Sequence, residues 1–191
     1  WSININTTNG AGANAAVWNN TNPTATHFTV GDDGQTNRNA YTYVAYVFAG
    51  SGDADSEIFG EGGDQSMIKC GTYTGNQSDL VVDIGFEAQW LMVKRMDANG
   101  QDWMVMDKIS GFGPWRNSSM GDAAALDANT NGSQLGQSGS GGTGVRCASS
   151  VKGFQFVSES QPDVNTNSGT YLYVAIRDTD AKVTKPAEVG T

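Results

Sequence analysis

Cysteine and histidine are scarce in this sequence, and their scarcity limits the chemistry that the chain can support. The two cysteines, Cys70 and Cys147, are too few for a disulfide framework, and their spacing excludes a CxxC metal or redox motif. Because both lie beside strand-like apolar runs, we interpret them as buried, unbridged thiols, with a single disulfide as the alternative. The only histidine, His27, lies in the segment HFTV, where we expect a core-edge or surface position.

Catalytic and nucleotide-binding motifs are also missing. The sequence contains no G-x-S-x-G, P-loop or HExxH motif. A catalytic triad needs a base beside a nucleophile, and nothing in the sequence places His27 in that setting. We therefore expect a protein that is not an enzyme and that needs no cofactor other than the calcium considered below.

Runs of positive charge and long apolar segments are missing too. The 11 Lys and Arg residues are scattered among 20 Asp and Glu residues, so the net charge is −9 and the sequence pI is near 4.3. This pattern argues against a nucleic-acid groove. No stretch approaches the roughly 20 apolar residues of a membrane helix, so we expect no membrane insertion. An acidic surface rich in Asn and Thr suits an extracellular or virion protein, and an acidic cytosolic protein is the alternative.

What the sequence does contain is short apolar runs separated by Asn, Thr, Ser, Gly and Asp. This composition is typical of a turn-rich, all-β protein. The centre of the core is expected in residues 81–107, where WLMV and WMVM read as two strands around the turn at residues 97–100. The charges beside that turn, Lys94 among them, are expected to be solvated. The only helix candidate is residues 122–126 (DAAAL).

Further strands are expected on both sides of this hairpin, at residues 27–30, 41–48, 67–74, 79–86, 153–157 and 171–176. The strongest is YTYVAYVF at residues 41–48. Both of its faces are apolar, so it should be covered on both sides or pair with another domain.

An internal repeat organises the chain. YTYVA at residues 41–45 matches YLYVA at residues 171–175, an offset of 130 (171 − 41), and INTTNG near the N-terminus echoes DANTNG at residues 127–132. We therefore expect residues 1–50 to be the C-terminal part of a preceding repeat and residues 51–66 a Gly/Asp-rich linker or loop. Residues 67–178 would be one complete repeat, and residues 179–191 a connector tail.

The segments YVAYVFAG, MIKCGTYTGN, IGFEAQWLMVKR and SGTYLYVAIRD resemble a repeated β-rich domain of tail-fibre and other virion structural proteins of marine phages, particularly cyanophages. The resemblance covers roughly residues 26–178. It implies an antiparallel β-sandwich, jelly-roll or lectin-like, arranged in tandem along a virion appendage. The Gly-rich loop at residues 131–144 departs from that pattern.

Two kinds of binding site can be considered in the loops. Asp53, Asp55 and Glu57 alternate in GDADSE, and such oxygen ligands suit Ca²⁺, although the rest of an EF-hand loop is missing. Trp115, with Phe112 and Arg116 beside it, is the candidate platform for a carbohydrate, and the alternative is a loop aromatic packed on the core or on a neighbouring subunit.

The preferred function is a non-enzymatic virion module that contributes to host-surface attachment, located on the virion outside the cell. Its expected partners are other copies of itself in a homo-oligomer such as a trimer, other virion proteins and a host-surface glycan. One alternative is a secreted carbohydrate-active enzyme, a depolymerase, using two of the carboxylates at positions 83, 87, 97, 102 and 107. The other is a bacterial surface adhesin or filament subunit.

Overall fold

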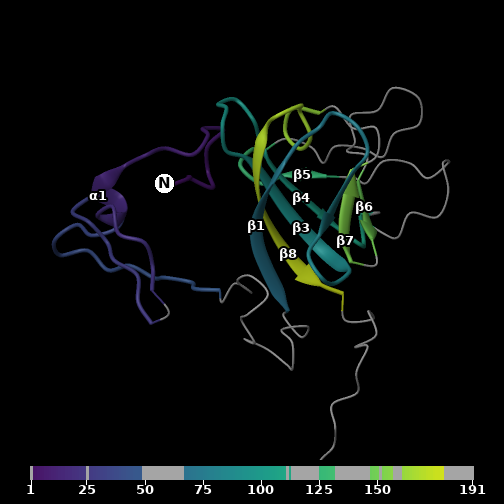
Figure 1. The fold of residues 1–191 in the computed structure, drawn as a ribbon. Helices are drawn as coiled ribbons and strands as arrows, with labels where there is room; N and C mark the ends of the chain where they lie inside the picture. Colours follow the sequence, from purple (N-terminus) through teal and green to yellow (C-terminus); the bar gives the residue numbers. More distant parts are fainter. Residues whose placement is uncertain are drawn as a thin grey trace, which may run out of the picture.

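The fold was obtained as a computed structural model, which describes residues 2–24, 26–48, 67–110, 112, 125–131, 147–150, 152–156 and 161–178. In these residues the chain forms antiparallel β-sheets and almost no helix, so the all-β expectation is confirmed (Figure 1). The elements are α1 (Ala15–Trp18), β1 (Ile68–Thr74), β2 (Leu80–Asp83), β3 (Ala88–Arg95), β4 (Trp103–Asp107), β5 (Leu126–Asp127), β6 (Cys147–Ser150), β7 (Gly153–Phe156) and β8 (Thr170–Arg177).

Two sheets share one core. The larger has the order β1-β8-β3-β4-β5 and the smaller has the order β2-β7-β6. Side chains from both sheets meet in the core cluster, where the ring of Tyr73 on β1 lies 5.8 Å from Phe154 and 5.7 Å from Phe156 on β7. The burial of these aromatic rings is the main force that holds the sheets together.

The central hairpin forms as expected. β3 and β4 pair in antiparallel register with Met92 opposite Val105, and Gly100 takes a φ of +79° in the turn between them. Leu91, Val93 and Met104 are fully buried. The hairpin therefore supplies part of the core, as its dense apolar composition predicts.

The expectation for Lys94 is wrong. Its side chain is fully buried, and its Nζ donates to the carbonyl oxygen of Gln101 at 2.5 Å. The hairpin folds back on the segment that carries Asp163, so the charge next to the turn lies under that segment and away from water.

The N-terminal residues differ most from the sequence-based expectation. Residues 27–30 and 41–48 form no strand, and the short helix α1 was not expected. Asn14 caps α1 by accepting a hydrogen bond from Ala16 N, and Asn19, in the left-handed region, ends it. Leu126 of the expected 122–126 helix lies in β5, and residues 122–124 lie outside the described residues.

Backbone hydrogen bonds attach the start of the chain to the β3–β4 turn. Ala11 N donates to Met96 O at 2.7 Å and Gly100 N donates to Thr8 O at 2.9 Å. Gly10 fits closely here, because a Cβ at this residue would lie 2.6 Å from Met96 O. Beyond this attachment the chain passes through α1 and extends away from the sheets (Figure 1).

Cys70 also departs from expectation. It is a thiol without a disulfide, as expected, but it lies exposed on β1, one of the two edge strands of the larger sheet. Cys70 and Tyr73 are three positions apart on the strand, so their side chains lie on opposite faces. Tyr73 is buried, and Cys70 therefore points away from the core. The side chain of Cys147 lies outside the described part of the chain.

Candidate functional site

The most unusual surface of the described chain is the apolar segment at residues 41–48. Six of its eight side chains are large, hydrophobic and exposed, with Val44 77% and Tyr46 84% exposed. The other four exposed side chains are those at positions 41, 43, 47 and 48, so the patch covers the whole segment. A run of this kind on a protein surface usually marks a contact with another chain or domain.

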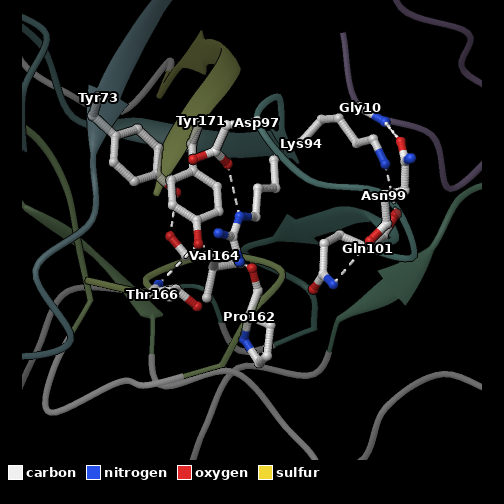
Figure 2. A network of polar contacts seen from close by, with 11 residues as sticks. Gly10, Tyr73, Lys94, Asp97, Asn99, Gln101, Pro162, Val164, Thr166 and Tyr171 are labelled. Carbon is white, nitrogen blue, oxygen red and sulfur yellow. Dashed lines mark hydrogen bonds and ion pairs between the residues drawn. The ribbon is translucent and has the colours of Figure 1, made fainter. Parts of the chain in front are cut away.

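The turn that precedes this segment has the geometry of the turn that precedes β8. Tyr171 Oη donates to Pro162 O at 2.9 Å and accepts from Thr166 N at 2.8 Å. Figure 2 shows the Tyr171 hydroxyl between these two backbone groups, with the ring of Tyr73 beside it. The first bond reaches a residue nine positions before the tyrosine, and the second reaches a residue five positions before it.

Tyr43 makes the same two bonds over the same spacings. Its Oη donates to Gly34 O and accepts from Arg38 N, both at 2.8 Å. The two tyrosines are 128 positions apart (171 − 43), so the structure aligns the two turns two residues away from the offset of 130 given by the sequence match. The match of YTYVA to YLYVA therefore joins the same two segments as these turns do, in a register shifted by two residues.

The backbone follows the same offset. Asn37 N donates to Asp33 O as Asn165 N donates to Gln161 O, and Tyr41 N donates to Arg38 O as Gly169 N donates to Thr166 O. Ala40 has a φ of +63° and its counterpart Ser168 has a φ of +61°. Residues 33–43 and 161–171 therefore form one turn twice.

The surroundings of the two turns are different. Asn165 is fully buried, accepts a hydrogen bond from Asn76 N at 2.9 Å and donates to Ser78 O at 2.8 Å. Its counterpart Asn37 is exposed, and its amide donates to Gly31 O within the same segment. After the turn, β8 is paired on both edges, whereas residues 41–48 form no ladder within the described part of the chain.

A second feature is a cluster of charged side chains under the central hairpin. Asp102 N donates to Asp163 Oδ1 at 2.6 Å, and Asn129 Nδ2 donates to Asp102 Oδ1 at 2.8 Å. Burial raises the pKa of Asp163, and burial lowers the pKa of Lys94 against the opposing effect of both carboxylates. These bonds tie the hairpin to the β5 turn and to the turn before β8, so the arrangement is a structural one.

Asp127 lies beside this cluster. Burial, together with the charges of Asp102 and Asp163, raises the pKa of its carboxyl. Its buried Oδ1 has no hydrogen-bond partner among the described residues. Among those residues no group of three or more His, Cys, Asp or Glu side chains is arranged to hold a metal ion.

The carboxylates that the sequence places near the hairpin bind their own neighbours. Asp83 accepts from Gly85 N, Asp97 pairs with Arg95 at 2.8 Å, and Asp107 is bonded to Ser110. Glu87 lies 3.9 Å from Lys108, which also contacts Asp178. These interactions hold Asp83, Asp97 and Asp107 within their own turns, and Lys108 joins Glu87 to Asp178 across neighbouring strand ends.

The loop sites expected from the sequence are placed only in part. Phe112 is fully buried in the core cluster, so its ring is not available as part of a surface platform. Trp115 and Arg116 lie outside the described residues, as do Asp53, Asp55 and Glu57. Carbohydrate binding at Trp115 and Arg116 and calcium binding at the three acids therefore stay predictions.

The fold defines a class of protein: a β-rich domain with two antiparallel sheets and a duplicated turn. Residues 1–179 match the family described as "Domain of unknown function (DUF7483)", and the chain belongs to that family. The chain has no match among curated proteins or among solved structures. No helix in the described part of the chain has the length and apolar character needed to cross a membrane.

Proposed function

We propose that the domain is a non-catalytic structural module of a phage virion. It is a β-sandwich used in tandem along a tail fibre or appendage that contributes to host-surface attachment. The observation that supports this role most is the second copy, at residues 33–48, of the turn and strand sequence found at β8. A chain that carries the same unit more than once is suited to an array of like domains, each in contact with its neighbours.

The construction of the sheets also supports a structural role. β8 and β3 are paired along both edges, and the turn before β8 is bonded through backbone groups to the residues that follow β1 and through the side chain of Asp163 to the hairpin. Such a scaffold is rigid, and its connecting loops supply the surface that varies between contacts. The partners of the module are other copies of itself in a homo-oligomer such as a trimer, other virion proteins and a host-surface glycan.

The role is tested by measuring the mass of the purified chain by light scattering, alone and with envelope polysaccharide from cyanobacterial cells. We expect an assembly larger than a monomer that binds the polysaccharide without shortening it. Trp115→Ala should weaken the binding and leave the mass of the protein assembly unchanged, and dextran should not bind. A monomer that shortens the polysaccharide would overturn the proposal in favour of a depolymerase.

A further inference from the structure

β8 shows which neighbours residues 41–48 need. β8 lies between β1 and β3 and is antiparallel to both. The turn before it is also bonded to the residues that follow β1, since Gly75 N donates to Gly169 O at 2.8 Å and Ser168 N donates to Gly75 O at 2.9 Å. The turn at residues 33–43 has the same shape, so it is built to receive a segment of the same kind.

Two backbone groups illustrate what is missing at the N-terminal turn. In the complete turn Gln77 N donates to Asn165 O at 3.0 Å. In residues 33–43, Asn37 O corresponds to Asn165 O and Ala40 N corresponds to Ser168 N. Within the described part of the chain neither has such a partner. None of the described residues is bonded to this turn as the residues after β1 are bonded to the turn before β8.

We propose that residues 41–48 form the β8 strand of a further copy of this domain, whose β1–β4 half precedes residue 1 in the same chain. In that copy the segment pairs with a β1-type strand on one edge and a β3-type strand on the other. The core-facing positions are Tyr43, Ala45 and Val47, which match the buried residues of β8 at 171, 173 and 175.

The order of the repeated elements places this half on the N-terminal side. Thr7 N donates to Asn4 O at 3.4 Å, as Thr130 N donates to Asp127 O at 3.3 Å in the turn after β5. Asn-Thr occupies the same two places in both turns, at an offset of 123 (130 − 7). The two matching turns, at residues 4–7 and 33–43, therefore follow each other in the same order as the turn after β5 and the turn before β8. The part still to be supplied is β1–β4, which comes before β5.

Other ways of covering the segment fit less well. In a second copy of this chain the place between β1 and β3 is already taken by its own β8, with Tyr171 fully buried there. Addition to the exposed edge of β1 would cover one edge of residues 41–48 and leave the matching turn without its partner. Only a β1–β4 half without its own β8 satisfies both edges and the turn.

The pairing has a specific register. Tyr173 lies opposite Gly71 on β1, and its hydroxyl occupies the space that a Cβ of Gly71 would need. At the 128 offset the residue in this place is Ala45, which leaves the space over that glycine empty. At the 130 offset the residue opposite the glycine would instead be Tyr43. Position 45 would then match Ala175, which is fully buried, so the larger side chain of Ala45→Tyr would not fit there.

The test uses the full chain with residues 67–123 added ahead of Trp1, so that the added segment takes the place of β1–β4. Hydrogen exchange followed by mass spectrometry measures residues 41–48 in this extended chain and in the chain as it stands. We expect exchange to slow by roughly 100-fold or more in the extended chain, independently of protein concentration. Ala45→Tyr should increase the protection further.

Val44→Pro in the extended chain is the control, because proline removes a donor from a paired strand. It should abolish the protection of residues 41–48 without changing the exchange of β8. Equal and fast exchange of residues 41–48 with and without the added segment would overturn the proposal, and so would an added segment that remains unprotected. Protection in the unextended chain that rises with concentration would also overturn it, in favour of pairing between separate molecules at the edge of β1.

A loss of protection on Ala45→Tyr would overturn the register and point to the offset of 130. The inference rests on the proposed structural role for the existence of a further copy, but the two tests have different readouts. Hydrogen exchange reports strand pairing, and light scattering with polysaccharide reports attachment. A failure of the strand-pairing inference can therefore be told apart from a failure of the proposed attachment role.

Discussion

Residues 33–48 and 161–176 carry the same turn and related sequences after it, yet residues 170–176 lie in a central strand of a sheet and residues 41–48 are exposed and form no strand. The turns share their hydrogen bonds at matching positions, including those of Tyr43 and Tyr171. β8 is paired with β1 and β3, whereas residues 41–48 have no such neighbours in the described part of the chain. The comparison shows that the turn is determined locally and that the strand depends on what lies beside it.

The largest difference between the two segments is expected for proline. Leu172→Pro removes a donor from the middle of β8, whose residues pair with both neighbouring strands, and should cost about 3 kcal/mol or more of unfolding free energy. Val44→Pro, at the matching position, should change it by less than about 0.5 kcal/mol. Urea denaturation of the two variants measures both values. Equal losses would show that residues 41–48 are paired.

Asparagine gives the next largest contrast. Asn165→Ala deprives Asn76 N and Ser78 O of their partner inside the protein, which should cost about 1–3 kcal/mol. Asn37→Ala removes one exposed bond to Gly31 O and should cost less than about 0.5 kcal/mol. Thermal unfolding of the two variants measures both changes in unfolding free energy. A large decrease for Asn37→Ala would mean that the turn at residues 33–43 is already covered by another part of the protein.

The tyrosine hydroxyls should differ in the same direction by a smaller amount. Tyr171→Phe leaves Thr166 N and Pro162 O without their buried partner, at a cost of about 1–2 kcal/mol. Tyr43→Phe breaks two bonds at a residue that is 43% exposed, where water replaces them, so the global stability should hardly change. Hydrogen exchange of residues 33–43 should nevertheless become faster, since the turn itself is loosened.

The smallest expected effect concerns pH. Because burial raises the pKa of Asp163 in the folded state, the stability linked to this group is present below its unfolded pKa and is lost as the pH rises through the raised value. The decline in unfolding free energy should be well below the roughly 1.4 kcal/mol per pH unit expected for one fully linked proton. Asp163→Asn should remove it. Denaturation midpoints measured from pH 3 to pH 7 test this, with the exposed Asp32→Asn as the matched control. A decline that persists in Asp163→Asn would assign it to another group.

Sequence patterning predicted the part of the fold that is built from neighbouring residues. The β3–β4 hairpin, β1, β2 and β8 were expected at or near their observed positions, because apolar runs bounded by turn residues have few other stable arrangements. β5 and β6 were not predicted. β5 has only two residues and exists because β4 offers it an edge, which periodicity does not record.

The features missed at the candidate site depend on contacts between distant residues. The burial of Lys94 follows from the segment that carries Asp163, 69 positions further along (163 − 94), and the core position of Phe112 follows from the packing around it. The register of the duplicated turn required the bonds of Tyr43 and Tyr171. A signal for it was present in the asparagines at positions 37 and 165, which also lie 128 apart (165 − 37).

By itself the sequence determined the β class and the central hairpin and indicated that residues 41–48 and 171–176 are related, since alternation, turn residues and short-range hydrogen bonds act within a few residues. The tertiary structure alone decided which of two similar strands is buried. A strand is stable only when both its backbone groups and its apolar side chains have partners. β1 and β3 supply them to β8, whereas residues 41–48 pair with no strand among the described residues and six of their side chains are exposed.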